Sequence, residues 1–388
     1  MKNFIRIPLN LVDRLRSDIN PLRGLSMPVV VNQLEEGARG AYADLQWTYN
    51  FIERRDATLR ACKRRIHSAL RSLDWEIKIP ENLDAEGARL AQAQADALRE
   101  AYDRIENLRE AFEFLALAEF RGFSHLEKIW NGETITRLEP VPQWHWVRKG
   151  IYGRWQFNPE SRGGTTDGQD IDPSNFLIRE VSDPIDEIAL VCYVRKGLSA
   201  KDWDGFVENF GIPYTFIIMP PQTSERERAA YEDTVRRIAA DGRGVLPQGS
   251  EIKTADSGNR GTNPFREHLD YQDEQIVLAA TGGLLTMLSQ PTGIGSGASQ
   301  AHADTFSQIA RALALEVSEI FQAQLDADIL KKLFPSQKPL AYFELCSGDT
   351  HDVKNIFENA VLARNAGYAV DPAQLQEKTG YKLLSNEK

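Results

Sequence analysis

The segment NPFREHLDYQDEQIVLAATGGLLTMLSQPTGIGSGASQAHADTFSQIARALALEVSEIFQAQLDADILKKLF, residues 263–334, predicts two helices separated by a glycine-rich loop. Its opening Asn-Pro pair suits the cap and first turn of a helix, and the Gly-Gly pair at 282–283 ends that pattern, so we expect the first helix over 264–281. From 300 to 334, apolar residues recur every three or four positions, which predicts a long amphipathic helix. These three elements organise the rest of the chain.

Three carboxylates share one face of the first helix. Glu267, Asp270 and Glu274 stand at i, i+3 and i+7, and Asp273 lies beside them. Such a face repels polyanions. A nuclease could bind a divalent metal through these carboxylates, but nothing in the segment supplies the accompanying lysine or a further ligand, so a solvated or channel-facing row is the preferred interpretation.

The loop between the helices, residues 282–299, combines an apolar tip with five glycines and no charged residue. Its notable residues are Leu284, Leu285, Met287, Leu288, Gly293, Gly295 and Ser296. The glycines follow no predicted strand, so phosphate binding is disfavoured. An uncharged, flexible loop suits a mechanical part better than an enzyme lid, which normally carries reactive side chains.

Length and composition restrict the possible classes. With 388 residues the chain can form two or three domains, and its net charge of -10 argues against a protein that wraps nucleic acid tightly. Three cysteines, far apart and without metal-ligand spacing, indicate reduced thiols in a cytosolic protein. The sequence shows neither a signal peptide nor an apolar run long enough for a membrane span, so we expect a soluble protein with no membrane partner.

A basic helix is predicted near the N-terminus. Residues 1–45 resemble an extended arm, although a helix could begin within 33–47, and 50–73 is a clear amphipathic helix. Its polar side holds Arg54, Arg55, Arg60, Lys63, Arg64, Arg65 and Arg71 against only Glu53 and Asp56. We favour a solvated face or a contact with acidic neighbours, with direct DNA contact as the main alternative.

The remaining pattern mixes helices and strands, so the expected fold class is α+β. The predicted elements before residue 184 are a strand at 75–79, two helical pieces within 84–119 that meet near Asn107, a hairpin with an Asn131-Gly132 turn, strands at 144–148, 155–157 and 176–180, and a surface loop at 158–172. Those after it are a helix at 184–210 with a kink at Lys196-Gly197, a β-α-β-β piece at 214–254, a strand at 340–345 and two helical pieces within 352–384.

We find no catalytic, cofactor-binding or metal-binding motif, and we expect no enzyme. The chain lacks the G-x-x-x-x-G-K-[ST] pattern of nucleotide-binding loops. His302 and Asp304 point to different faces of a helix, and His125, His145, His268 and His351 are isolated and fit surface or core positions better than a general base. Ser296 and Ser299 have no nearby His/Asp arrangement.

The order of several motifs resembles the Mu-like bacteriophage portal protein family, the head–tail connector portals of tailed phages. The motifs are FIERRDATLRACKRRIHSALRSLDWEI, VENFGIPYTFIIMPPQTSERERAAYEDTVRRI followed by GVLPQGSEIK, LDYQDEQIVLAATGGLLT, and SQAHADTFSQIARALALEVSEIFQAQL. Together they cover most of residues 50–335, and their shared order makes the resemblance specific.

The resemblance implies a portal fold with named parts. These are an N-terminal arm and wing (1–183), a first stem helix (184–210), a small α/β clip (211–262), a second stem helix (263–281), a tunnel loop (282–299), a long wing helix and strand (300–345) and a crown-like helical region (346–388). Such chains assemble as a ring, a dodecameric homo-oligomer, at one vertex of the capsid in the virion, after assembly in the host cytoplasm.

The resemblance also implies roles for residues and partners. Double-stranded DNA passes through the ring without sequence specificity, driven by the terminase large subunit, and the ring contacts the major capsid protein and the head–tail connector. The implied residues are Glu267, Asp270 and Glu274 on the channel wall; Leu285, Met287, Leu288, Gly293, Gly295 and Ser296 in the tunnel loop; and Tyr214, Phe216, Glu227 and Arg228 on the partner-binding clip.

Two other classes stay open at this stage. One is a metal-dependent phage nuclease that uses Asp270, Asp273 and Glu274, which an assay for Mg²⁺-dependent cleavage would reveal. The other is a monomeric DNA-binding adaptor that uses the basic helix over 54–71, which predicts steeply salt-dependent binding to free duplex DNA.

Overall fold

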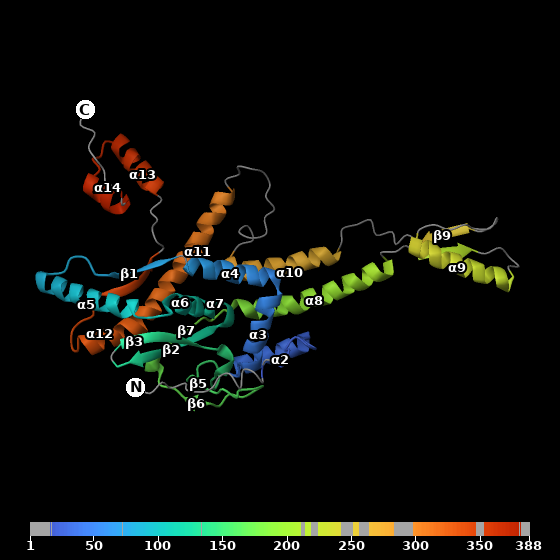
Figure 1. Cartoon of the computed structure of the whole chain (residues 1–388), viewed down its shortest axis with the longest axis horizontal. Coiled ribbons are helices and arrows are strands. Elements are labelled where there is room, and N and C mark those ends of the chain that lie inside the picture. Colours follow the sequence, from blue (N-terminus) through green and yellow to red (C-terminus); the bar gives the residue numbers. More distant parts are fainter. Residues whose placement is uncertain are drawn as a thin grey trace. The chain divides into compact units, whose positions relative to one another are not determined.

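The computed structural model describes Arg16 and residues 18–71, 73–132, 134–210, 214–218, 224–241, 251–255, 264–282, 298–346, 353–379 and 381 (Figure 1). The chain divides into two compact units. The first unit contains Met1–Leu190 and Ile276–Lys388, and the second contains Val191–Gln275. Helices and strands occur in both units, which agrees with the expected α+β class.

The N-terminal part of the first unit is more helical than we expected. Helix α2 spans Met27–Ala38, so the prediction of an extended arm over 1–45 is wrong there. The single helix predicted over 50–73 is also wrong, because α3 (Ala43–Arg55) and α4 (Ala57–Arg71) are separated at Asp56. Asp56 is extended, with φ -81° and ψ 121°, and its side chain accepts a hydrogen bond from the Leu59 backbone N–H at 2.9 Å. An aspartate that caps a new helix therefore divides what looked like one amphipathic pattern.

A layer of aromatic rings joins residues far apart in the chain. Strand β1 (Asp74–Lys78) pairs antiparallel with β10 (Tyr342–Cys346), beside helices α5 (Ala85–Asp103) and α6 (Leu108–Ala116). The ring of Phe343 in β10 stacks on Tyr102 at 4.6 Å between centroids and lies 5.0 Å from Phe321. Burial of these large rings, together with Phe112, forms one of the strongest apolar contacts of the first unit.

Two antiparallel three-stranded sheets complete the β structure of the first unit that the model describes. One has the order β3-β2-β7, with β2 at Phe123–Asn131, β3 at Thr134–Val141 and β7 at Phe176–Glu180. The other has the order β4-β5-β6 and consists of Trp146–Val147, Gln156–Phe157 and Gln169–Asp170. The predicted hairpin and the strand at 176–180 are confirmed. The strand predicted at 144–148 is confirmed only at 146–147, because Trp144 and His145 belong to a 3₁₀ turn.

Between these sheets lies a cluster of buried residues, of which all but Val141 are aromatic. Its members are Tyr42, Phe123, Val141, Trp146, Trp155, Phe157 and Phe176. His125 is fully buried and stacks on Trp146 at 3.9 Å, and His145 is fully buried as well. Both histidines are therefore core residues, as their isolation in the sequence suggested.

The long helix near the C-terminal end contains an irregular turn. Helix α11 (Ala298–Phe321) continues through a π-helical segment (Gln322–Asp326) into α12 (Ala327–Leu333), so the predicted helix over 300–334 is interrupted. In this turn the Gln324 side chain accepts a bond from the Ile178 N–H at 2.7 Å and donates to the Ile178 carbonyl at 2.9 Å. Asp326 accepts bonds from the Tyr102 hydroxyl at 2.6 Å and the Phe343 N–H at 2.7 Å. The π turn directs the side chain of Gln324 toward β7 and that of Asp326 toward β10. The backbone groups they reach bond to these side chains instead of to a neighbouring strand.

The second unit contains the end of a long helix and a small α/β piece. Helix α8 (Ile185–Phe210) is a single helix that runs through Lys196-Gly197, the position of the expected kink. Strand β8 (Tyr214–Ile218) pairs antiparallel with β9 (Glu251–Ala255), and helix α9 (Glu225–Asp241) contacts β8. The strand predicted at 244–246 lies outside the described residues. Helix α10 (Pro264–Thr281) has the predicted bounds.

The last described helices are α13 (Val353–Asn365) and α14 (Pro372–Thr379), which confirms the two helical pieces expected after residue 352. Among the helices of the described residues, none combines the length and the apolar character needed to cross a lipid bilayer.

Gly40 offers a test of the close contact between the α2–α3 connection and the backbone of Arg148, which follows β4. Its φ is +97°, and an added Cβ would lie 1.9 Å from the Arg148 carbonyl oxygen, whereas Gly24 has φ +76° with no atom within 4 Å of such a Cβ. We expect Gly24→Ala to cost about 1–2 kcal/mol from the left-handed backbone alone, and Gly40→Ala about 2–5 kcal/mol because overpacking is added. Urea unfolding of both variants measures this, and equal losses would contradict the close approach.

Candidate functional site

Helices α8 and α10 pack against each other through polar and aromatic contacts inside the second unit. Lys196 Nζ lies 2.5 Å from Asp273 Oδ1, and Ser199 Oγ lies 2.6 Å from His268 Nδ1. Further along, the rings of Phe206 and Phe265 are 5.8 Å apart between centroids. Residue numbers increase along α8 while those of the contacting residues decrease along α10, so the two helices are antiparallel. The same contacts show which face of α10 is turned away from α8.

The face of α10 that is turned away from α8 carries the predicted acidic row. Glu267 and Asp270 are exposed and Glu274 is half-buried. The row is less purely acidic than the sequence suggested, because Tyr271 is 50% exposed on the same side and Arg266 lies 3.7 Å from Asp270. A side chain on this face can meet solvent or a large partner.

Asp273 does not belong to this row, which corrects the prediction that it lies beside the other carboxylates. Its carboxylate is bound by Lys196 of α8. In the described part of the chain no three His, Cys, Asp or Glu side chains form a group that could hold a metal ion, and this includes the set of Asp270, Asp273 and Glu274. The geometry thus gives the nuclease interpretation no metal centre in these helices.

The predicted clip residues lie on β8 and α9. Tyr214 and Phe216 pair through their backbones with Ala255 and Lys253 of β9. Just before α9, Ser224 Oγ donates to Glu227 Oε2 at 2.6 Å and the Ser224 N–H donates to it at 2.9 Å. The Glu227 N–H donates back to Ser224 Oγ at 3.4 Å, so the two residues form a capping box. These bonds lower the pKa of Glu227. Glu227 therefore has a local structural task, while Arg228 is exposed.

The predicted tunnel-loop residues lie outside the described residues. They are Leu285, Met287, Leu288, Gly293, Gly295 and Ser296. Helix α10 ends at Thr281, where the expected loop was to begin, and α11 starts at Ala298.

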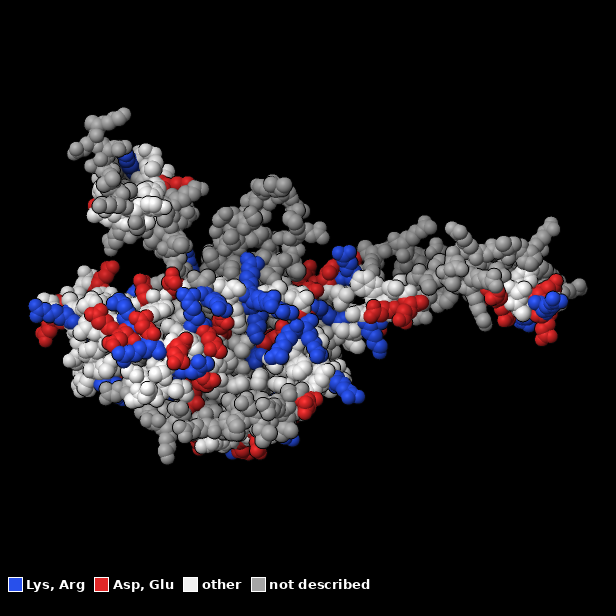
Figure 2. Space-filling model, viewed as in Figure 1, with Lys and Arg blue, Asp and Glu red and all other residues white. Residues whose placement is uncertain are grey.

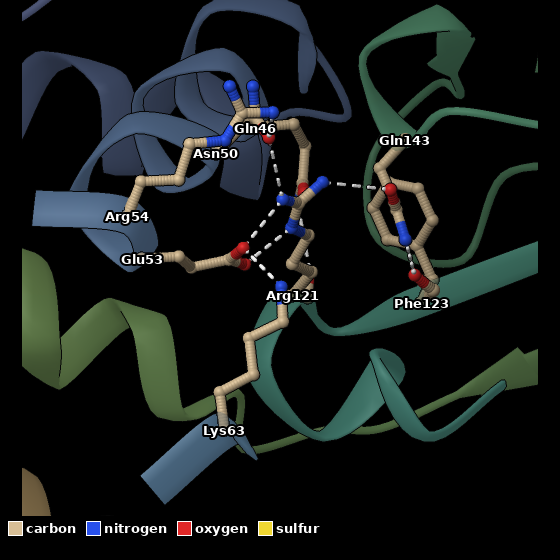
Figure 3. Close-up of polar contacts among 8 residues, drawn as sticks. All are labelled: Gln46, Asn50, Glu53, Arg54, Lys63, Arg121, Phe123 and Gln143. Atoms are coloured by element: carbon tan, nitrogen blue, oxygen red, sulfur yellow. Dashed lines mark hydrogen bonds and ion pairs between the residues drawn. The ribbon is translucent and has the colours of Figure 1, made fainter. Parts of the chain in front are cut away.

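A buried charge network in the first unit was missed by sequence reasoning (Figure 3). Arg121, at the end of α7 (Ala118–Arg121), donates from Nε to Glu53 Oε1 at 2.6 Å and from Nη2 to Glu53 Oε2 at 2.8 Å. Lys63 donates to Glu53 Oε2 at 2.5 Å, and Arg121 also donates to Gln143 Oε1 at 3.0 Å. One carboxylate thus connects α3, α4 and α7. Glu53 and Lys63 had been assigned to the polar side of a single helix.

Asp186, in the first turn of α8, is a second buried carboxyl beside this network. Burial and the negative charge of Glu53 raise the pKa of Asp186 well above its usual range. Burial would also raise the pKa of Glu53, but the charges and hydrogen bonds of Arg121 and Lys63 outweigh it and lower that pKa to about 2. Among the described residues, neither oxygen of Asp186 has a hydrogen-bond partner as a carboxylate, whereas a protonated Asp186 can donate to Glu53. The two acids therefore favour opposite protonation states.

With this geometry established, the chain can be compared with known proteins. A family model described as the portal protein of Mu bacteriophage matches residues 46–381. The chain is 22% identical over 278 residues to the Mu-like prophage FluMu protein gp29 of Haemophilus influenzae, covering 69% of this chain and 52% of that protein. It is also 22% identical over 299 residues to the portal protein of Escherichia phage Mu, covering 70% of this chain and 54% of that protein. The chain spans about half the length of the curated relatives it matches.

Solved structures show the same fold. A chain in the neck of an empty GTA particle, computed with C6 symmetry, has a TM-score of 0.58 and 13% identity and covers 84% of this chain and 90% of that one. A chain in the virion of a native gene transfer agent (GTA) particle has a TM-score of 0.57 and 13% identity, with coverage of 90% and 94%. A chain in the neck of a native GTA particle, computed with C12 symmetry, has a TM-score of 0.55 at 13% identity, with coverage of 84% and 90%. The expected α+β fold is confirmed.

The two buried carboxyls should respond differently to loss of charge. Glu53→Gln leaves the buried Arg121 guanidinium without its counter-ion and should cost about 3–5 kcal/mol of unfolding free energy. Asp186→Asn should cost little or stabilise, because an amide can donate to Glu53 as a protonated acid does. Denaturant unfolding at neutral pH measures both, and a large loss in Asp186→Asn would show that Asp186 is needed as an anion.

The pH dependence follows from the same pKa shifts. Because the folded pKa of Glu53 is about 2 against 4.5 for the free side chain, its stabilisation is present above 4.5 and is lost as pH falls toward 2. Asp186 acts oppositely, since its raised pKa makes the folded state less favourable as pH rises above 3.8. We expect the free energy of unfolding of Glu53→Gln to fall less than that of wild type as the pH is lowered from neutral to acid. We expect that of Asp186→Asn to rise relative to wild type as the pH is raised from acid to neutral. Unfolding curves across this pH range provide the measurement.

Proposed function

Because the chain belongs to the family of portal proteins of Mu bacteriophage, we propose that it assembles into a ring that forms a DNA channel at one vertex of a phage capsid. In this function DNA enters during packaging, is retained, and leaves on ejection, and the ring joins head to tail. The protein would be made in the host cytoplasm and would act in the virion. The observation that carries the proposal is the exposed acidic face of α10 on a chain with this fold.

The acidic face suits a channel wall because repetition strengthens it. A single copy offers Glu267, Asp270 and Glu274 on one face, a modest charge that salt would screen. Many copies around an axis place such rows side by side, so duplex DNA meets a continuous negative potential. DNA is then repelled from the wall and slides, because the three carboxylates outnumber Arg266, the cation described beside them, and leave little positive charge to exchange for its counter-ions. The channel would be structural, with no catalytic residue of its own.

The number of copies and the partners belong to the same proposal. The similar neck chain computed with C12 symmetry supports a ring of twelve copies. The α8–α10 pair would form the stem, and the β8-α9-β9 piece would form the clip that meets the terminase large subunit and then the head–tail connector. Arg228, which is exposed on α9, is available for such a contact. The major capsid protein would surround the ring.

Two measurements separate this function from the nuclease alternative. Mass photometry of purified protein under assembly conditions should show a closed oligomer, and a species that stays monomeric at high concentration would count against the channel. An assay for Mg²⁺-dependent cleavage of duplex DNA should show no product. Cleavage that disappears in Asp270→Asn would replace the channel with the nuclease.

Reversing the charge of the acidic row tests its role in transport. Glu267→Lys combined with Glu274→Lys should leave ring formation intact and reduce the amount of packaged DNA, because lysines on the wall would bind the passing phosphates. The control is Glu81→Lys combined with Glu86→Lys, which makes the same change in net charge elsewhere. Both residues are exposed, Glu81 just before α5 and Glu86 in its first turn.

Packaged DNA per particle and ring formation are measured for both variants. Equal packaging by wild type and the stem variant would remove this account of the acidic row, even if the ring itself is confirmed.

A further inference from the structure

A polar cleft of about 610 Å³ lies in the first unit, where α3 and α4 meet α6. Its lining consists of Asn50, Glu53, Arg54, Arg60, Lys63, Arg64, His67, Ser68, Arg71 and Glu113. None of these residues is apolar. Figure 2 shows Lys and Arg side chains gathered over α3 and α4 on this face of the molecule.

The cleft has more positive charge than its own carboxylates can neutralise. Five of its lining residues are Lys or Arg and two are Glu. Glu53 is already bound by Arg121 and Lys63 in the buried network, and Glu113 lies 3.3 Å from Arg71.

Three guanidinium groups remain without a carboxylate. Arg54 is exposed and donates to the neutral side chain of Asn50 at 3.1 Å. Arg60 and Arg64 are exposed and form no ion pair with any residue in the described part of the chain. A local excess of cations thus exists on a chain whose net charge is -10.

These cations are displayed by a helix that is held rigidly. Arg60, Arg64 and Arg71 stand at i, i+4 and i+11 on α4, so they form a row on one face about 16 Å long at 1.5 Å per residue. The opposite face buries Leu59, Cys62, Ile66 and Leu70. The Asp56 cap at one end and the Lys63–Glu53 bond hold α4 in place. The row needs little reorganisation to meet a ligand.

The chemistry of the cleft favours a phosphate backbone over a peptide or a membrane. A peptide groove or a membrane surface is normally lined by apolar side chains, and every residue that lines this cleft is polar or charged. Guanidinium groups match phosphate oxygens with paired N–H donors. The row of about 16 Å spans about five steps of a duplex that rises 3.4 Å per base pair. Ser68 and His67 add hydrogen-bonding groups, and burial followed by the charge of Lys63 lowers the pKa of His67 to about 4, so its ring is neutral near pH 7.

We propose that this cleft binds the phosphate backbone of duplex DNA without sequence preference, as a contact separate from the acidic face of α10. The choice of DNA as the polyanion rests on the proposed function, whereas the row of arginines does not depend on ring formation. One chain would then repel DNA along α10 and hold it weakly at α4. Added salt would weaken the attraction of DNA to the arginines of α4, and it would also weaken the repulsion of DNA by the carboxylates of α10.

Binding of the full-length chain to a short fluorescent duplex, followed by anisotropy at several salt concentrations between about 50 and 200 mM, tests the site. Arg60→Glu combined with Arg64→Glu should weaken binding at low salt at least tenfold, and should reduce the slope of log K against log salt by about two, one for each lost phosphate contact. Arg60→Gln combined with Arg64→Gln, which removes charge without reversing it, should reduce the slope by the same amount.

The matched control is Arg89→Glu combined with Arg99→Glu, two exposed residues of α5 that change the net charge equally outside the cleft. It should keep the wild-type slope. Absence of duplex binding by wild type, or an equal loss in the cleft variants and the control, would overturn the proposal. Binding of polyglutamate but not of duplex would also overturn it, since the partner would then be an acidic protein.

Mass photometry of the same variants keeps this result separate from the proposed channel. The cleft variants should form the same oligomer as wild type. Loss of duplex binding with a normal ring would support the cleft, and a ring that never forms would refute the channel while the anisotropy result still decides the cleft.

Discussion

The buried bond between Arg121 and Glu53 is the constraint on which the first unit depends. Taking two charges out of water is expensive, and the pair is tolerable only because each oxygen and most of the N–H groups have partners. These partners come from α3, α4, α7 and the turn at Gln143, so the bond specifies how those elements meet. Asp186 adds the first turn of α8 to the same place. The first turn of α8 is thus held in a network with little freedom to rearrange.

Ion pairs inside the protein also decide which charged side chains are left on the surface. Arg121 binds Glu53, so this carboxylate is not available to neutralise the arginines of α4. Arg60 and Arg64 therefore line the cleft without it. Lys196 of α8 binds Asp273 of α10, whereas Glu267 and Asp270 of the same helix stay exposed. A net charge of -10 describes neither surface, because internal pairing decides which charges a partner meets. The proposed repulsion along α10 and the proposed contact at α4 both follow from such pairing.

Irregular backbone connects distant parts of the chain in this protein. The π turn at Gln322–Asp326 points Gln324 at the edge of β7 and Asp326 at Phe343 and Tyr102. A regular helix would aim these side chains differently, and the edge strand would lose its amide partner. The long helix therefore does more than span the unit, since it supplies side chains that take the place of a neighbouring strand.

The sequence by itself determined the elements that depend on local physics. The bounds of α10, the division of α5 from α6 near Asn107, the Asn131-Gly132 hairpin, the Ser224–Glu227 capping box and the shared face of Glu267, Asp270 and Glu274 all follow from residues a few positions apart. The break between α3 and α4 is also local, because Asp56 caps α4 from three residues away, but the continuous apolar pattern concealed it. The tertiary structure alone decided that Asp273 turns to Lys196 and that Glu53 meets Arg121. These contacts join residues up to 77 positions apart, and their partners are chosen by packing and desolvation, which no short window of sequence contains.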